Sequence, residues 1–542
     1  MLRTELIRPL TELLRANAVT VGEKTAFADA RRSVTWAELD RRTARVAGHL
    51  AGLGVQPADR VLLYLQDCVE AVETYLAVLR AGGISAPVHT GLEDAELASL
   101  LADSKAAAVF TDPANLAQVR RLLADFPDLT VVLVDHDGEP TAQDRAEPVY
   151  STLATTEPEF AGDSDLGLDD LAFLTYTAGT TGSPRGVLFS QRNVMWAIAA
   201  CYAPILGLGA DDRVCCPLPL AEGLAQQVGV IGVVTVGATG WIANASAADL
   251  GDLIAQRSGF LTDLVEQRIT FLAGMPSTYH DLLWAAERQE TVESDLRTCL
   301  VAGSTGVPAL REAFDDKFGV RLLDSYMTTE TTGPVAVNWP TDGRVDAMGG
   351  LPIPGISVRV IDLRTGTDAG IGQEGEIWVS GPNVMAGGYH NQSEAAPPAV
   401  TDGWYHTGDL AKRDELGYLT ITGRIAEVIT RGAELINPRE IETVLLGVSG
   451  VAAAVVIGEL DDAMGEVPVA YLQAGPEGLD PNEIFAACCR GLSPAKVPVE
   501  LYRVDEIPRA RAGRLARRAL LDVPAELIAV LPVERSPRTD PR

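Results

Sequence analysis

Strand-like and helix-like segments alternate along the first 330 residues of this 542-residue chain. Residues 59–65, 84–88 and 171–176 are apolar runs of strand length, typical of buried strands. Residues 73–79 lie between the first two runs, have helical spacing, and are followed by a pair of glycines. Such alternation predicts α/β layers with mostly parallel strands. A further helix is expected over residues 2–16, where apolar residues recur at helical spacing.

The pattern changes after residue 350. Residues 358–362 and 375–381 alternate with period two between Gly-rich turns, which predicts a β-barrel or meander. A second change falls near Gly423. We therefore predict a large N-terminal domain at residues 1–422, with two α/β lobes and a β-barrel-like lobe, and a small α+β C-terminal domain at residues 423–530. The Pro- and Arg-rich residues 531–542 are predicted to be disordered.

The formal net charge of −30 limits the classes of partner. Such a surface repels nucleic acid and anionic lipid, so neither is expected as a partner. It also repels free nucleotides, so a nucleotide site in this chain must be locally positive or metal-assisted. The longest weakly polar run, residues 228–243, is short and interrupted for a membrane span, and the N-terminus has no signal-peptide core. We expect a cytoplasmic protein with no membrane helix; the oligomeric state is left open.

A loop rich in glycine and hydroxyl groups follows the predicted strand at residues 171–176. Between Thr177 and Gly186 side-chain bulk is nearly absent, so backbone N–H groups and hydroxyls can approach an anion closely. No Gly-Lys-Ser/Thr follows, so this is not the common G-x-x-x-x-G-K-[ST] phosphate loop. The residues expected to contact phosphate are Thr177, Gly179, Thr180, Thr181, Gly182 and Arg185.

This loop resembles the T-S-G-T-T-G-x-P-K-G signature of the adenylate-forming superfamily. That superfamily comprises acyl- and aryl-CoA synthetases, peptide-synthetase adenylation domains and luciferases. Ala178 replaces the usual Ser and Arg185 the usual Lys. Four further motifs follow in the family's order, and the resemblance covers about residues 20 to 520. The resemblance implies binding of ATP and Mg²⁺, and a C-terminal domain that is mobile.

A second motif, residues 324–333, resembles the family's Y-G-x-T-E, with Met327 in place of Gly. A strand at residues 320–323 is expected to run into a hydroxyl-rich turn. There Tyr326 can stack on a purine, and Thr329 can hydrogen-bond a phosphate. Glu330 can hold Mg²⁺ through oxygen. Ser325 is assigned to the same nucleotide site. An upstream segment resembles the one that lies along the adenine and the acyl pocket; its site residues are Gly303, Ser304 and Gly306.

Two motifs resemble the family's C-terminal half of the site. By resemblance, Asp409 and Arg424 hold the two ribose hydroxyls. The family's hinge residue is Ala426 here, which still permits rotation of a small domain. The family's catalytic Lys, which bridges the carboxylate, the α-phosphate and the ribose, falls on Arg514. Arginine keeps the charge, but its planar fork is not interchangeable with an ammonium group.

The substrate pocket is expected around residues 217–224, where many family members show P-L-[FY]-H-x-x-G. Leu220 occupies the histidine position. Glu222 and Gln226 place polar groups near the expected acyl site, and Gly306 and Met327 are assigned to the same pocket. Glu222 can recognise an amine or simply face solvent, and the sequence does not distinguish these alternatives.

Together the motifs predict an ATP-dependent ligase that activates a carboxylic acid as acyl-AMP with release of pyrophosphate. The acyl group then passes to the thiol of CoA or of a carrier-protein phosphopantetheine. The expected partners are a small-molecule acid and an acyl carrier protein. One alternative keeps the fold but adenylates another oxyanion, such as nitrite, for transfer to an amine. The other alternative is a nucleotide-binding protein that has lost turnover through Arg514.

Overall fold

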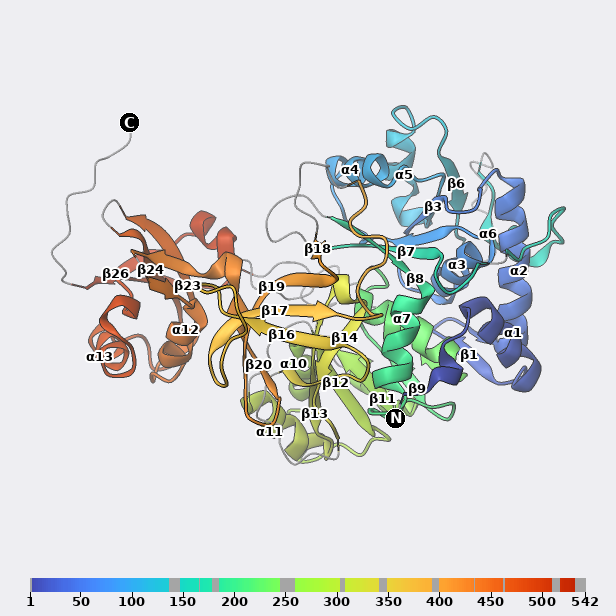
Figure 1. Cartoon of the computed structure of the whole chain (residues 1–542). Coiled ribbons are helices and arrows are strands. Elements are labelled where there is room, and N and C mark those ends of the chain that lie inside the picture. Colours follow the sequence, from blue (N-terminus) through green and yellow to red (C-terminus); the bar gives the residue numbers. More distant parts are fainter. Residues whose placement is uncertain are drawn as a thin grey trace. The chain divides into compact units, whose positions relative to one another are not determined.

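The computed structural model describes residues 2–135, 147–164, 166–177, 185–243, 259–302, 308–340, 349–391, 399–432, 434–461, 464–508 and 517–531. The chain divides into two compact units, which are treated separately below. Unit 1 consists of Met1–Val358 and Val379–Tyr405, and unit 2 of Arg359–Trp378 and His406–Arg542 (Figure 1). The predicted α/β fold with a large N-terminal and a small C-terminal part is confirmed.

The first sheet of unit 1 has six strands in the order β6-β5-β3-β4-β7-β8. All neighbours are parallel except β8, which runs antiparallel to β7. The strand predicted at residues 171–176 is β7. The bounds are β3 (Arg60–Tyr64), β4 (Ile84–Pro87), β5 (Ala108–Thr111), β6 (Thr130–Leu133), β7 (Leu171–Tyr176) and β8 (Gly186–Ser190).

Both faces of this sheet are covered, which explains the continuous apolar runs of its strands. Leu62 packs with the cluster that includes α4 and α5, whereas Leu63 packs with the cluster that includes α2 and α3. Side chains of successive strand residues point to opposite faces, so one short run serves two cores. The helices are α2 (Trp36–Gly52), α3 (Val69–Arg80), α4 (Asp94–Ser104), α5 (Pro113–Leu122) and α6 (Tyr150–Thr155).

The prediction of a helix over residues 2–16 is wrong about where the helix begins. A 3-10 turn, η1 (Thr4–Leu6), comes first, and α1 (Leu10–Thr20) begins only after Pro9. Proline disfavours helical geometry at the residue before it and has no N–H to donate. The helix therefore starts at the residue that follows Pro9.

The second sheet of unit 1 takes strands from distant parts of the chain, in the order β15-β14-β13-β12-β11-β9-β10-β1-β2. Strands β1 to β13 along this row are parallel, and the outer pairs at each end are antiparallel. The bounds are β1 (Thr25–Ala28), β2 (Ser33–Thr35), β9 (Arg213–Cys215), β10 (Thr239–Trp241), β11 (Phe271–Gly274), β12 (Thr298–Ala302), β13 (Leu322–Thr328), β14 (Gly333–Val337) and β15 (Gly349–Pro352). The helical segments of this lobe are α7 (Gln191–Ala197), η2 (Ile198–Tyr202), η3 (Ala225–Gly232), α8 (Val233–Val236), α10 (Pro276–Ala285) and α11 (Pro308–Phe318).

The prediction of a strand at residues 320–323 is wrong about where the strand ends. β13 continues to Thr328, because Tyr326 pairs with Ala336 of β14 and Thr328 with Gly333. Only the 3-10 turn η4 (Thr329–Thr331) remains of the predicted hydroxyl-rich turn.

Unit 2 contains two groups of strands. β16 (Ser357–Ile361), β17 (Glu374–Ser380), β19 (Trp404–Arg413) and β20 (Leu419–Arg424) lie wholly or mostly in this unit and are neighbours in chain order, as in a meander. The short strand β18 (Val400–Thr401) belongs to unit 1 and pairs with Trp404 and Tyr405 of the same unit, at the start of β19. A second sheet has the order β22-β21-β24-β25-β26, with β23 beside β24. The predicted boundary at residue 423 falls inside unit 2 and stays a prediction.

The second sheet of unit 2 packs against two helices. Its strands are β21 (Ile429–Arg431), β22 (Glu434–Ile436), β23 (Val451–Asp461), β24 (Gly465–Ala474), β25 (Glu500–Val504) and β26 (Glu526–Val530), and its helices are α12 (Pro438–Leu446) and α13 (Pro481–Gly491). Asn437 caps α12 by accepting from the Arg439 N–H at 3.1 Å.

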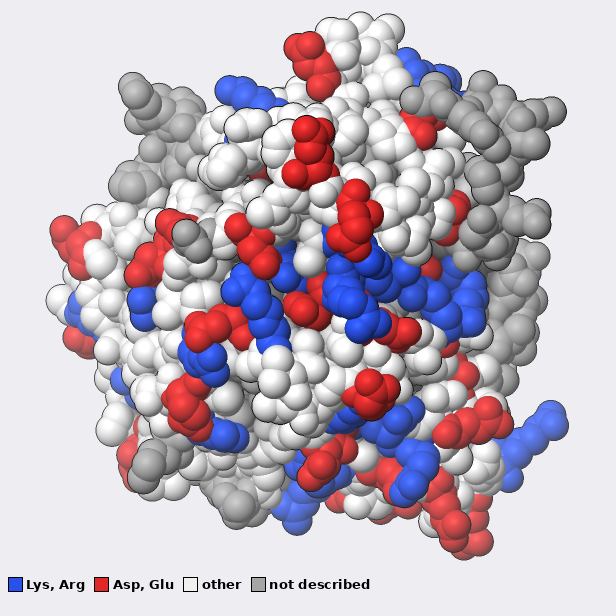
Figure 2. All heavy atoms as spheres, turned by 90° about the vertical axis from the view of Figure 1, so that its right-hand side faces the viewer, with Lys and Arg blue, Asp and Glu red and all other residues white. Residues whose placement is uncertain are grey.

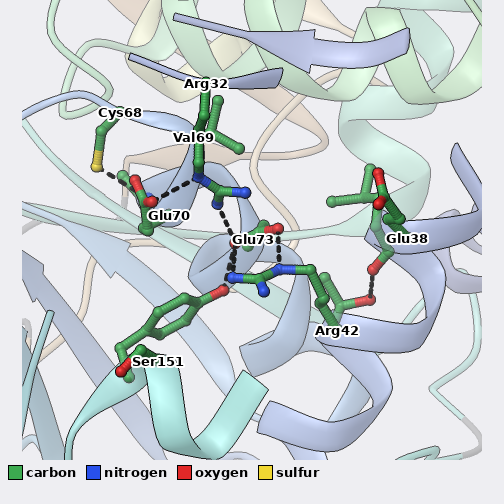
Figure 3. A network of polar contacts seen from close by, with 12 residues as sticks. Arg32, Glu38, Arg42, Cys68, Val69, Glu70, Glu73 and Ser151 are labelled. Atoms are coloured by element: carbon green, nitrogen blue, oxygen red, sulfur yellow. Dashed lines mark hydrogen bonds and ion pairs between the residues drawn. The ribbon is translucent and has the colours of Figure 1, made fainter. Parts of the chain in front are cut away.

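A buried ionic network joins several elements of unit 1 (Figure 3). Glu73 of α3 has no solvent exposure. Its carboxylate lies 2.6 Å from Arg32, which precedes β2, and 2.6 Å from Arg42 of α2. The Tyr150 hydroxyl of α6 donates to the same carboxylate at 2.6 Å. Arg32 also contacts Glu70, one turn earlier on α3, at 2.6 Å. Because every charge has an opposite partner, the network fastens α2, α3 and α6 together without a buried unpaired ion.

The acidic charge of the chain is not spread evenly. On the face of unit 1 that carries α1 and α2, basic side chains gather in a band with acidic side chains beside them (Figure 2). Exposed ion pairs of this region include Arg8 with Glu12 at 2.6 Å and Arg15 with Asp163 at 3.1 Å. Among the described residues, no helix combines the length and the apolar character needed to cross a membrane.

Candidate functional site

Glu330 lies in the short turn η4, directly after strand β13. Its side chain is buried, and its backbone carbonyl accepts from the N–H of Met385 at 2.9 Å. Thr328 caps the turn by accepting from the N–H of Thr331 at 3.2 Å. The turn is thus held from two sides, and Glu330 has a defined position at the carboxyl end of β13.

A tyrosine that the motifs did not include contacts Glu330. The Tyr389 hydroxyl donates to Oε1 of Glu330 at 2.6 Å. Burial raises the pKa of Tyr389, and the neighbouring Glu330 carboxylate raises it further, so the hydroxyl keeps its proton. The guanidinium of Arg185 lies over the Tyr389 ring, 4.2 Å from its centroid. Tyr389 thereby links the end of the glycine-rich loop to Glu330.

Backbone pairing with β8 brings Tyr389 to this place. The N–H of Gly387 donates to Leu188 at 3.0 Å, and the N–H of His390 donates to Gly186 at 2.7 Å. A Cβ on Gly387 would lie 2.6 Å from the Leu188 Cβ, so only glycine permits this approach. In the sequence, a pair of glycines before an aromatic residue is the one sign that this tyrosine has a special position. That pattern does not predict which strand the segment will pair with.

The two ends of the glycine-rich loop are joined to each other. The N–H of Thr177 donates to the carbonyl of Arg185 at 2.9 Å, and the N–H of Arg185 donates to Oγ1 of Thr177 at 3.3 Å. The loop is therefore closed at its base by β7 and β8, with Arg185 exposed beside it. Some predicted site residues lie outside the described residues: Gly179, Thr180, Thr181, Gly182, Gly303, Ser304, Gly306 and Arg514.

For the ATP-dependent adenylation that the motifs predict, replacing Tyr389 with phenylalanine is expected to lower kcat about tenfold, because a hydrogen bond to a charged group is lost while the ring under Arg185 remains. The measurement is pyrophosphate release at saturating ATP, with the KM for ATP determined alongside. Tyr471→Phe is the matched control, since Tyr471 donates to Glu459 at 3.2 Å in unit 2. Equal rates for Tyr389→Phe and the wild type would show that the hydrogen bond from Tyr389 does not position the Glu330 carboxylate.

The structure places the other predicted site residues of unit 1 in the core or at its edge. Gln226 is 1% exposed and accepts from Tyr75 at 3.2 Å and from Thr175 at 3.4 Å. Ser325 and Tyr326 are buried on β13, and Met327 packs against the main core. Thr329 begins the turn η4. Gln226 thus contacts Thr175 of β7, the strand that leads into the glycine-rich loop.

Glu222 neither faces open solvent nor stands alone. Its Oε1 lies 3.3 Å from Nε2 of His89, and its side chain is 15% exposed. His89 follows β4 and lines a cavity of about 150 Å³ together with Asp67, which follows β3. Oδ1 of Asp67 accepts from the N–H of Leu220 at 3.0 Å, so the segment expected at the acyl site closes this cavity.

The Asp67 carboxyl gives the protein a specific pH dependence. Burial raises its pKa from the ordinary 3.8 to about 6, against the opposing effect of its bond to Leu220. A pKa raised by folding stabilises the protein at low pH, and this contribution is lost as pH rises toward 6. Relative to Asp67→Asn, the free energy of unfolding of the wild type should therefore fall by up to about 3 kcal/mol between pH 4 and pH 7. Urea unfolding at several pH values checks this, and a pH-independent difference would contradict it.

In unit 2, the structure brings Asp409 and Arg424 together. They face each other across β19 and β20, and Nε of Arg424 lies 2.9 Å from Oδ1 of Asp409. The Asp409 side chain is buried and that of Arg424 is half-exposed. The ring of His406 stacks on Trp378 with centroids 3.9 Å apart, which supports a structural role for this histidine.

Comparison with known proteins identifies the family to which this chain belongs. The family model described as AMP-binding enzyme matches residues 14–390, and the model of the AMP-binding enzyme C-terminal domain matches residues 440–514. The chain belongs to the AMP-binding enzyme family, and its resemblance to the adenylate-forming superfamily is confirmed.

Individual relatives extend the match over nearly the whole chain. Naringenin synthase of Pestalotiopsis fici is 33% identical over 96% of this chain, but the chain spans only 19% of that protein. Feruloyl-CoA synthase of Amycolatopsis sp. is 31% identical, covering 91% of this chain and 94% of that one. The ATP-bound structure of MatB from Rhodopseudomonas palustris superposes with a TM-score of 0.84 at 27% identity, covering 94% of this chain and 98% of that one.

Proposed function

We propose that the chain is an ATP-dependent ligase that joins a carboxylic acid to a thiol through an acyl-AMP intermediate. The observation that carries the proposal is the chain of contacts from Thr177 through Arg185 and Tyr389 to Glu330. It holds a cation and a carboxylate beside the glycine-rich loop. The names of the relatives, a feruloyl-CoA synthase among them, support a CoA thiol as acceptor. A carrier-protein thiol is the other acceptor we propose.

In the first step, a carboxylate oxygen of the acid attacks the α-phosphorus of ATP, and the bond to pyrophosphate breaks. Negative charge builds up on the phosphate oxygens, so the site must supply fixed positive groups. Arg185, beside the loop, is one such positive group. We propose that Arg514 is the second. In the second step, the thiol loses its proton to solvent, its sulfur attacks the acyl carbon, and the bond to AMP breaks so that AMP leaves. No side chain forms a covalent intermediate.

The residues around Glu330 fit a magnesium ion. Oε1 is bonded to Tyr389, and among the described residues no hydrogen bond is formed by Oε2, which leaves that oxygen for a hard cation. A bound Mg²⁺ would supply charge neutralisation at the phosphates. Tyr389 would orient the carboxylate toward it. We propose that Asp409 and Arg424 hold the ribose, and that Tyr326, Ser325 and Thr329 complete the nucleotide site.

Pyrophosphate release measured over a panel of acids tests the function, with and without CoA. Ferulate and indoleacetate head the panel, because a feruloyl-CoA synthase and an indoleacetate–CoA ligase are relatives of 31% identity. CoA-dependent formation of a thioester supports the proposal. Turnover only with nitrite and an aryl amine would replace it with transfer to an amine. ATP binding without pyrophosphate release under any condition would leave a nucleotide-binding protein.

Arg514→Lys tests the placement of the second cation. A planar guanidinium contacts two phosphate oxygens at once and an ammonium group cannot reproduce this geometry. We therefore expect adenylation to slow about tenfold, measured as acid-dependent exchange of pyrophosphate into ATP. Arg511→Lys, in the same motif, is the control. An unchanged rate for Arg514→Lys would place Arg514 away from the reacting phosphate.

A further inference from the structure

The cavity beside Leu220 lies at the edge of the first sheet where ligands are expected. Its walls come from the residues after β3 and β4, and from the segment that precedes Glu222. The glycine-rich loop starts at the same edge, because β7 is the parallel neighbour of β4. In open α/β sheets, ligands bind outside the carboxyl ends of the strands. The position of the cavity therefore favours a ligand that takes part in the reaction.

The cavity has a mostly apolar lining with a few polar residues. Leu63, Val88 and Leu220 are among the apolar lining residues, and the polar ones are Gln66, Asp67, His89 and Thr90. The family pattern has a histidine at position 220. Here that position supplies an apolar wall, and the imidazole comes instead from His89, two residues after the end of β4.

Among the polar lining residues, Asp67 offers a hydrogen-bond acceptor to a ligand. Oδ1 of Asp67 accepts from Leu220, whereas no described residue donates to Oδ2. His89 is held 3.3 Å from the Glu222 carboxylate. Two carboxylates near one small cavity disfavour an anionic ligand. A ligand that donates a hydrogen bond would satisfy the acceptor that Asp67 leaves open.

The size of the cavity limits the group that it can hold to about one ring. A cavity of about 150 Å³ with apolar walls is large enough for benzene. We propose that this cavity binds part of a substrate, namely a ring-sized group that carries a hydrogen-bond donor, as in a phenol or an aniline. Only the identity of the molecule that carries this group rests on the proposed function. That molecule is either the acid, which would place its non-reacting end in the cavity, or an aryl amine acceptor.

Phenol, aniline and toluene are matched probes, because they have the same number of heavy atoms and only the first two donate a hydrogen bond. Each is titrated into the full chain without nucleotide, and binding is followed by ligand-observed NMR. We expect phenol or aniline to bind about tenfold more tightly than toluene, the difference that a hydrogen bond to a charged acceptor makes.

Two variants test the location. Asp67→Asn should remove most of the preference over toluene, and Leu220→Phe should abolish binding of all three probes by filling the cavity. Ala221→Val serves if Leu220→Phe does not fold. Asp135→Asn is the matched control, since Asp135 follows β6 in the same sheet and accepts from the Ser151 N–H at 3.0 Å. The control should bind the probes as the wild type does.

The outcomes separate the two proposals. Equal binding of toluene and phenol, no binding at all, or binding that survives Leu220→Phe would overturn the cavity inference. With an active enzyme, a raised KM for the acid in the presence of the probe assigns the cavity to the acid. A raised KM for the acceptor assigns it to the acceptor, and no effect on either KM overturns its place in the reaction. Probe binding by a protein without pyrophosphate release would overturn only the proposed function.

Discussion

Replacing Glu330 with glutamine is expected to slow formation of the adenylate by about two to three orders of magnitude. Fixed charges that act on a developing phosphate charge are worth this much in a buried site. Glutamine keeps the size of the side chain and an oxygen that accepts from Tyr389, so the bond of 2.6 Å can persist. What the variant lacks is the negative charge that holds a divalent cation.

The measurement is acid-dependent exchange of pyrophosphate into ATP over a range of Mg²⁺ concentrations. We expect the midpoint of the Mg²⁺ dependence to rise together with the loss of rate, and Mn²⁺ binding followed by its electron paramagnetic resonance signal to weaken. Glu459→Gln is the matched control, because Glu459 also accepts a hydrogen bond from a tyrosine but lies in unit 2. A Glu330→Gln variant with an unchanged Mg²⁺ dependence would remove Glu330 from the metal site.

Replacing Glu73 with alanine is expected to lower the free energy of unfolding of unit 1 by about 3–5 kcal/mol. The substitution leaves Arg32 and Arg42 without their shared partner, and removing one member of a buried ion group leaves an uncompensated charge. The Tyr150 hydroxyl also loses its acceptor. Burial disfavours the charge of Arg42, and Glu73 is the main group that keeps its pKa above the ordinary value, with a further contribution from Tyr150.

Urea unfolding followed by tryptophan fluorescence measures this effect, since Trp378 belongs to unit 2 and the other tryptophans to unit 1. The matched control is Glu157→Ala, which breaks an ion pair with Arg45. The Glu157 side chain is 78% exposed. That loss should stay below about 1 kcal/mol. A similar loss for both variants would mean that the network of Glu73 contributes no more than a surface pair.

The local elements of unit 1 were largely predictable from the chain. The strand at residues 171–176 coincides with β7, and the runs at 59–65 and 84–88 enclose β3 and β4. These strands are buried on both faces, so their apolar character is visible without knowledge of their neighbours. The extent of β13 was not predictable, because its hydroxyl-rich end is held by pairing with β14 and not by apolar burial.

The order of the motifs is visible in the chain alone, and the nucleotide contacts were predicted from it. Pairings between distant segments were not. Strand β1 joins the second sheet beside β10, and Tyr389 reaches Glu330 across 59 residues. His89 meets Glu222 in the same way, at the edge of a different sheet. Local composition determines whether a segment is a strand, a turn or a phosphate loop. Backbone pairing in the folded sheets decides which remote side chains meet, and so it decided the partners of Glu330 and the walls of the cavity.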